Sequence, residues 1–286
     1  MRDVLTSPRV KDIKHKRRVS RMRFLVLILI LVVSFVGALA YFSGHRRLTI
    51  HAINVTGTQI INTSDVQSVV QKDLAGKYVY LFARADTAIY PHDQIYTDLI
   101  RAFPRIQTLS ITRSGWNALS VVITERAGAF LYCGTQIPAL EADQGDNCYF
   151  VNNDGYIFDK APYFSGNIYF KYYLSLNSVN PLGTQMLPVD TFHQLTQFID
   201  KVEALGFKAD YVSIDQNGMY ELYLDHAPTA TSPVITFNSD NDLSVIADNL
   251  TTAMATPQFA NEINSKYATL LYIDLRFKDK VLYKFQ

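Results

Sequence analysis

The chain has 286 residues, of which 48% are apolar, and its net charge is +1. That length fits about two domains, the apolar content excludes a disordered chain, and the near-neutral charge excludes a strongly basic nucleic-acid binder. The 18 Tyr and 17 Phe favour a chain rich in strands.

The first 42 residues combine a basic tail with an apolar run. Residues 1–23 hold nine Lys or Arg and two acidic residues, whereas the remainder is acidic overall. Residues 24–42, FLVLILILVVSFVGALAYF, carry no charge and would span roughly 28 Å as a helix, close to the thickness of a bilayer core. The positive-inside rule then predicts a cytoplasmic tail (1–23), a transmembrane helix (24–42) and an exported body. A signal peptide cleaved after Ala40 is the alternative, because Ala38-Leu39-Ala40 fits a cleavage site.

The next segment, 48–127, alternates between strand and helix signals. A strand at 48–58 ends at Gly57, and a helix with an apolar face begins near Thr63 and ends before Gly76. Residues 78–83 are expected to form a short extended link. A second helix covers 91–103 and stops at Pro104, and two strands then flank a turn at 114–116.

The remaining segment, 128–286, predicts a mainly antiparallel sheet with two helices, so that the expected fold class is α+β. The helices are expected at 190–207 and 240–255, where apolar residues recur with helical spacing. The clearest strand signal is the hairpin around Asn217-Gly218.

Two cysteines, Cys133 and Cys148, lie in this segment. Export permits a disulfide between them, and two free thiols are the alternative. Their spacing does not fit a zinc site. The sequence also shows no catalytic motif and no cofactor-binding motif, which predicts a protein that is not an enzyme and has neither metal nor cofactor.

The order of these segments resembles the FtsQ/DivIB family of bacterial cell-division proteins. The motifs that carry the resemblance are IHAINVTGT (50–58), FPRIQTLSITRSGWNALSVVITERAGAF (103–130), YFVNNDGYIF (149–158) and YIDLRFKDKVLYKF (272–285). The sequence departs from the family pattern at Asn117, where the family has Pro after the Trp, and at Ala127-Gly128. The resemblance implies a β-α-α-β-β POTRA domain (48–127), a following β domain (128–286) and a single-pass inner-membrane protein at the division septum.

The resemblance also implies partners. These are FtsB/FtsL-like coiled-coil membrane proteins and other divisome proteins, including the FtsW/FtsI-like septal peptidoglycan synthase, which the complex with FtsB and FtsL regulates in this family. The anchor would contact lipid, and no nucleic acid is expected. The alternative function is a POTRA-containing protein of envelope protein assembly or secretion.

The last seventeen residues, 270–286, alternate apolar and polar positions as a half-buried strand does. They are expected to form a strand from Leu270 to Phe277, a break at 278–280 and an edge segment at 281–285. By resemblance, an extended partner segment pairs with this edge. The implied contact residues are Arg276, Phe277, Lys278, Val281, Tyr283 and Phe285. For Phe277, Tyr283 and Phe285, packing in the core is an equal alternative, and Asp274 and Arg276 are expected to form an exposed ion pair.

Overall fold

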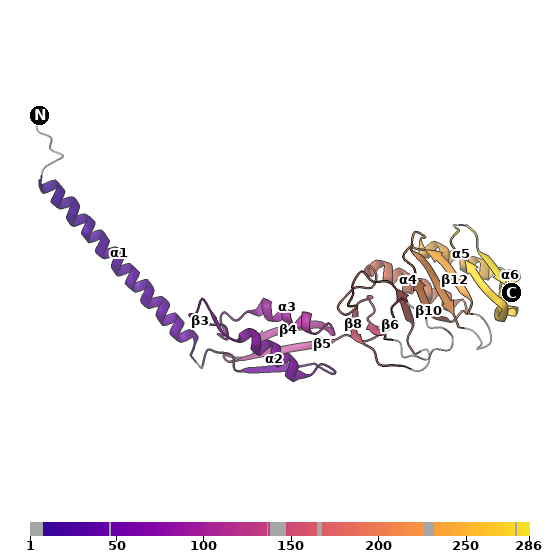
Figure 1. The fold of residues 1–286 in the computed structure, drawn as a ribbon, viewed down its shortest axis with the longest axis horizontal. Coiled ribbons are helices and arrows are strands. Elements are labelled where there is room, and N and C mark those ends of the chain that lie inside the picture. Colours follow the sequence, from indigo (N-terminus) through magenta and orange to yellow (C-terminus); the bar gives the residue numbers. More distant parts are fainter. Residues whose placement is uncertain are drawn as a thin grey trace, which may run out of the picture. The chain divides into compact units, whose positions relative to one another are not determined.

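The computed structural model describes residues 8–45, 47–135, 137, 147–164, 168–225, 232–277 and 279–286, with side chains from Val19 onward. The chain divides into two compact units (Figure 1). One comprises the chain up to Phe103 together with Thr108–Thr124, and the other comprises Pro104–Gln107 and Glu125–Gln286. The fold is mixed α and β, with six α-helices in the described part of the chain.

The first helix, α1 (Pro8–Ser43), contains the apolar run. Its segment Val19–Ser43 contains a stretch of 18 residues with a mean hydropathy of 2.9 and is long and apolar enough to cross a membrane. The apolar side chains from Phe24 to Val33 are exposed, as lipid-facing side chains would be.

The rest of the first unit is a three-stranded sheet with two helices. Its elements are β1 (Ala52–Thr56), α2 (Thr63–Leu74), β2 (Lys77–Tyr78), β3 (Phe82–Ala83), α3 (His92–Ala102), β4 (Ile106–Arg113) and β5 (Ala118–Glu125). The sheet order is β1-β5-β4, and β1 runs parallel to β5. Gly57 follows β1 at φ +86°, and a Cβ there would lie 2.1 Å from the Ile123 carbonyl oxygen, so only glycine fits this close approach.

The segment 78–83 differs from the extended link that the sequence predicts. Strands β2 and β3 pair with each other as a small hairpin, with Lys77 opposite Ala83 and Tyr78 opposite Phe82. The sequence carries no Gly or Asn at the turn between them, which is the signal that normally identifies a short hairpin.

A buried carboxylate lies between the two helices of this unit. Burial raises the pKa of Asp73 on α2, and the neighbouring Asp98 carboxylate raises it further, while Arg84 and Lys72 act in the opposite direction. An acid whose pKa is raised in the folded state stabilises the fold fully at pH values below its unfolded pKa of about 4. This contribution is lost as the pH rises through the folded pKa.

We therefore expect Asp73→Asn to raise the melting temperature of the full chain in detergent at pH 7. The gain should shrink as the pH falls toward about 4, because Asp73 is then protonated in both states. Circular dichroism melts at pH 4, 5.5 and 7 measure it. Asp65→Asn is the control, since Asp65 is exposed in the first turn of the same helix; a gain of equal size there would contradict the assignment to burial.

The second unit is built on a nine-stranded sheet of order β14-β13-β12-β11-β10-β9-β6-β7-β8. The strands are β6 (Phe130–Tyr132), β7 (Tyr149–Val151), β8 (Ile157–Lys160), β9 (Lys171–Leu174), β10 (Ala209–Ile214), β11 (Met219–Leu224), β12 (Val234–Asn238), β13 (Leu270–Asp274) and β14 (Leu282–Phe285). The sheet is mixed rather than purely antiparallel, because the pairs β6–β9, β9–β10 and β12–β13 are parallel. The Asn217-Gly218 hairpin forms as predicted between β10 and β11.

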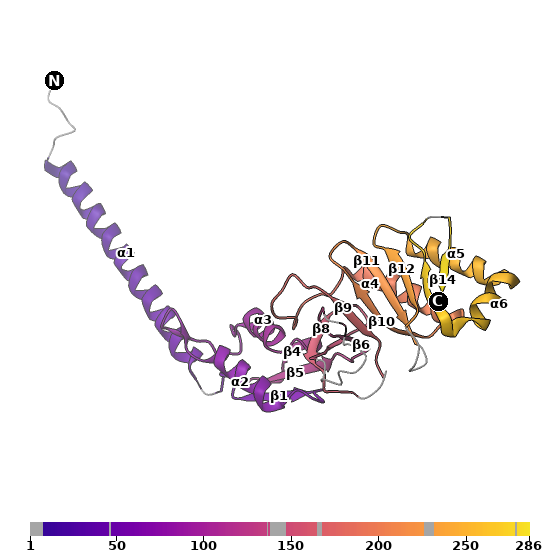
Figure 2. The ribbon, with the colours of Figure 1, turned by 45° about the vertical axis from the view of Figure 1, so that its right-hand side comes forward.

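Three helices cover the core face of this sheet (Figure 2): α4 (Val189–Ala204), α5 (Leu243–Ala255) and α6 (Pro257–Ser265). The prediction of two helices is therefore wrong, and α6 is the one it lacks. Pro257 stands at the start of α6, where its missing N–H costs nothing. Helix α6 has only nine residues, which is shorter than the stretch over which a helical period is normally recognised.

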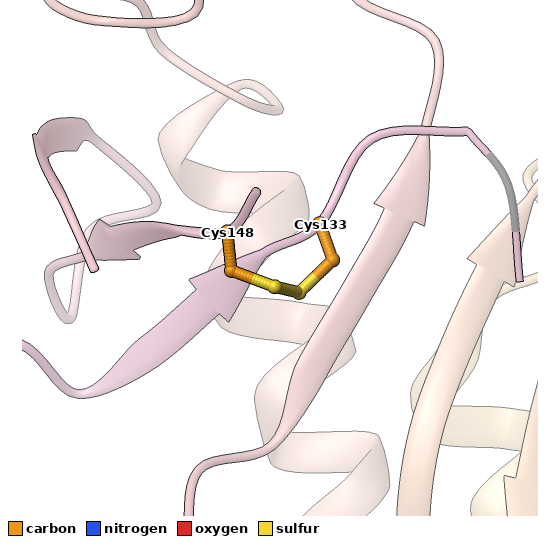
Figure 3. Close-up of a disulfide and its surroundings, with 2 residues drawn as sticks. All are labelled: Cys133 and Cys148. Carbon is orange, nitrogen blue, oxygen red and sulfur yellow. A yellow bond between two sulfur atoms is a disulfide. The ribbon is translucent and has the colours of Figure 1, made fainter. Parts of the chain in front are cut away.

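A disulfide joins Cys133, after β6, to Cys148, before β7 (Figure 3). Cys148 belongs to a small cluster of buried residues with Leu131 and Ala161, separate from the main core, against which Phe150, Phe164 and Tyr169 pack. The covalent bond therefore lies where the apolar core is small.

Candidate partner-binding edge

The end of the chain forms one edge of the large sheet. Strand β13 pairs in parallel with β12 and antiparallel with β14, and β14 is the last strand in the order. The predicted strand Leu270–Phe277 ends earlier, at Asp274. The Leu275 N–H still donates to the Thr236 carbonyl oxygen of β12 (2.8 Å), and the chain then turns away.

An ion pair shapes this turn. The Arg276 guanidinium donates to both oxygens of Asp274, from Nε to Oδ1 (2.9 Å) and from Nη2 to Oδ2 (2.6 Å), and the Arg276 N–H donates to Oδ1 (3.0 Å). These hydrogen bonds hold the pKa of Asp274 below its usual range. The prediction of an exposed pair is wrong in one respect: Asp274 is only 5% exposed. Breaking a pair with one buried partner leaves an uncompensated charge, so Arg276 has a structural role in the bend.

The main chain of β14 presents its free side to solvent. The Gln286 N–H donates to the Thr269 carbonyl oxygen, on the β13 side (2.8 Å). Because main-chain groups of a strand alternate in direction, Lys284 and Leu282 also face β13. The N–H and C=O groups of Tyr283 and Phe285 therefore point to the outer side, where no further strand lies in the described part of the chain.

At the opposite edge of the sheet, a loop of the same chain covers the start of β8. At β8, the Ile157 N–H donates to the Thr184 carbonyl oxygen and the Gly183 N–H donates to the Ile157 carbonyl oxygen, both at 2.9 Å. Exposed edges are liabilities that proteins usually cover or blunt. Within the described residues, a loop covers the start of β8 at one edge, and no segment covers β14 at the other.

The odd-numbered side chains of β14 pack inward. Tyr283 meets the Phe259 ring of α6 edge-on (5.0 Å between centroids), and its hydroxyl donates to Glu262 Oε2 (2.8 Å). This hydrogen bond and that of Lys266 lower the pKa of Glu262. The Lys266 ammonium lies over the Phe285 ring (5.3 Å), and Val281 packs partly buried against the core. The side chains of Tyr283 and Phe285 therefore hold β14 in place. The groups that these two residues leave free for binding are on the main chain.

The exposed apolar side chains at this edge lie elsewhere. Phe277 is 49% exposed in the bend, as a contact residue must be, and Leu282 and Tyr272 are 44% and 39% exposed on the face opposite the helices. Leu282 pairs with Asp274 and Tyr272 pairs with Lys284. Sequence reasoning missed Leu282 and Tyr272. Both stand at even-numbered positions, where the other residues from 272 to 286 are polar, and that departure could have identified them. Lys278 lies outside the described residues.

Across the described ranges, no group of three or more His, Cys, Asp or Glu side chains is placed to hold a metal ion. No protein-family model matches the chain, and a search of curated proteins finds no significant match.

Proposed function

We propose that the chain is a membrane-anchored, non-enzymatic scaffold of bacterial cell division, of the FtsQ/DivIB type. Its partners are FtsB/FtsL-like coiled-coil proteins, and through them it acts on an FtsW/FtsI-like septal synthase. In this proposal α1 is the transmembrane anchor, with a cytoplasmic N-terminus, and segments 48–127 and 128–286 are a POTRA domain and a β domain.

The observation that carries the proposal is the open edge at β14. An extended partner segment that pairs there gains main-chain hydrogen bonds for affinity and side-chain contacts for specificity. The outward groups of Tyr283 and Phe285 supply the former, and Leu282, Tyr272 and Phe277 supply the latter.

Three other features support it. Helix α1 has the length and hydropathy of an anchor. The first unit runs β1, α2, α3, β4, β5, interrupted by the β2–β3 hairpin, which is the order that a POTRA domain has in the family that the sequence resembles. The charge of the edge is suited to a partner with acidic residues, since Lys280 and Lys284 are exposed beside it.

We expect Phe277→Glu to abolish capture of the partner from cross-linked, solubilised membranes, because it places a charge in an apolar contact, whereas Phe277→Ala should reduce capture severalfold. Phe277 is exposed, so both variants should keep the parent's melting temperature. Val179→Glu is the control, since Val179, in the second unit, is fully exposed. Undiminished capture by Phe277→Glu would refute the assigned edge, and normal septation in cells depleted of the protein would refute the divisome function.

A further inference from the structure

The β2–β3 hairpin of the first unit carries an exposed apolar tip. Val79 is 81% exposed, Tyr80 is 94% exposed and Leu81 is 47% exposed. Three consecutive large apolar side chains in solvent gain nothing for the stability of the unit itself. Their exposure indicates that something apolar covers them in the working state.

The turn at this tip is also strained. Val79 and Tyr80 both have positive φ, at 48° and 62°, and the Leu81 N–H closes the turn on the Tyr78 carbonyl oxygen (2.9 Å). This is the geometry of a type I′ turn, for which Asn-Gly is the favoured pair. A β-branched residue such as Val is a clear outlier at positive φ. The chain thus keeps apolar residues at the tip where turn chemistry favours small polar ones.

The hairpin is bonded to the end of the membrane-length helix. The Ala83 N–H of β3 donates to Oγ of Ser43, the last residue of α1 (3.0 Å). The uncharged run 24–42 has nineteen residues and is about 28 Å long as a helix, close to the ~30 Å hydrocarbon core. Ser43 therefore lies at the level of the headgroups when α1 spans a bilayer, and the hairpin lies there with it.

A second exposed aromatic residue lies beside the same helix end. Trp116, in the turn between β4 and β5, is 75% exposed. Its carbonyl oxygen accepts a hydrogen bond from the Thr87 hydroxyl (2.6 Å), and the Thr87 N–H donates to the Leu48 carbonyl oxygen (2.9 Å). Trp116 and Arg113 line a hollow with Leu39 and Phe42 of α1.

We propose that the Val79–Leu81 tip and Trp116 insert into the interfacial layer of the lipid bilayer and seat the first unit on the membrane. This proposal rests on α1 being the anchor. Trp and Tyr are the side chains that favour the membrane interface. The exposed basic residues Arg47, Lys77 and Arg113 would meet lipid phosphates. Continuity with the anchor makes the bilayer the occupant, because Ala83 at the base of the hairpin is hydrogen-bonded to the last residue of α1.

The single tryptophan of the chain makes this testable without a label. The full chain is reconstituted into phosphatidylcholine–phosphatidylglycerol vesicles, and Trp116 fluorescence is quenched with lipids brominated near the headgroup end of the acyl chain or with aqueous iodide. We expect at least twofold quenching by the brominated lipid and a severalfold weaker response to iodide than that of a free tryptophan analogue. Iodide quenching equal to that of the analogue, without bromolipid quenching, overturns the proposal.

A double substitution tests the tip itself. Val79→Asn with Tyr80→Gly installs the favoured turn pair and removes the apolar side chains, so the fold should gain stability while bromolipid quenching of Trp116 falls by about half or more. Val179→Asn, in the second unit, should leave quenching unchanged. Quenching that is undiminished in the double variant overturns the role of the tip.

Carbonate extraction of the same vesicles tests the anchoring by α1 separately from the seating of the first unit on the membrane. Protein that stays in the membrane with an iodide-exposed Trp116 overturns the seating and leaves the anchor intact. Release of the protein overturns the anchor, and the seating with it.

Discussion

Tyr283→Pro should abolish capture of the extended partner, whereas Tyr283→Ala should only weaken it. Both variants lose the ring contact with Phe259 and the hydrogen bond to Glu262. Only proline also removes the outward N–H, which strand pairing needs, and places its ring where the partner strand would lie. One main-chain hydrogen bond is worth about 1 kcal/mol, and the clash adds to it, so we expect at least about a tenfold further loss of affinity.

Lys284→Pro provides the complementary control for this pair. The Lys284 N–H faces β13, as the register with Tyr272 indicates, so proline there breaks the protein's own sheet and should lower its melting temperature. Tyr283→Pro should be no less stable than Tyr283→Ala by that measure. Equal partner affinity of Tyr283→Pro and Tyr283→Ala, in a titration of the detergent-solubilised chains, would exclude strand pairing at β14.

Loss of the disulfide should have the second large effect, on stability alone. The bond closes a loop with a sequence separation of 15 residues, and loop-closure entropy for about 15 residues corresponds to about 3 kcal/mol. We expect Cys133→Ser with Cys148→Ser to lower the free energy of unfolding of the second unit by about that amount. Urea unfolding, followed by the loss of slow-exchanging amides in β6 and β9, measures it.

Reduction supplies the matched control for the cysteine variant. A reducing agent should destabilise the parent by a similar amount and leave the double variant unchanged. Stability of the reduced parent equal to that of the oxidised protein would show that the bond has no stabilising effect. Partner capture should survive in the double variant at low temperature, because Cys133 follows β6 and Cys148 precedes β7, and these strands lie six and seven positions from β14 in the sheet order.

Periodicity predicted the elements that have one strongly apolar face. Helix α4 is the clearest case, since Phe192, Leu195, Phe198, Ile199 and Val202 are buried at helical spacing. The Asn217-Gly218 turn was predictable because turn chemistry is local. The β2–β3 hairpin and α6 were not, because the hairpin has an atypical turn and the helix has only nine residues. In both, tertiary contacts supply what local preference does not.

The candidate edge was predictable in part. Alternation in 270–286 identifies a strand with one apolar face, but which side chains meet the core depends on α6, which the sequence did not reveal. The strand ends at Asp274 because Arg276 binds its carboxylate, a contact that no periodicity encodes. That β14 is an open edge depends on the order of nine strands, and strand order is a property of the whole fold.

The most direct test of strand pairing at β14 is amide hydrogen exchange at single-residue resolution. In the free full chain, the outward amides of Tyr283 and Phe285 should exchange quickly, while that of Lys284, bonded to β13, exchanges slowly. In the complex with the captured partner, Tyr283 and Phe285 should become protected by tenfold or more, with Lys284 little changed. Exchange of Tyr283 and Phe285 that is equally fast in the free chain and in the complex would contradict the account.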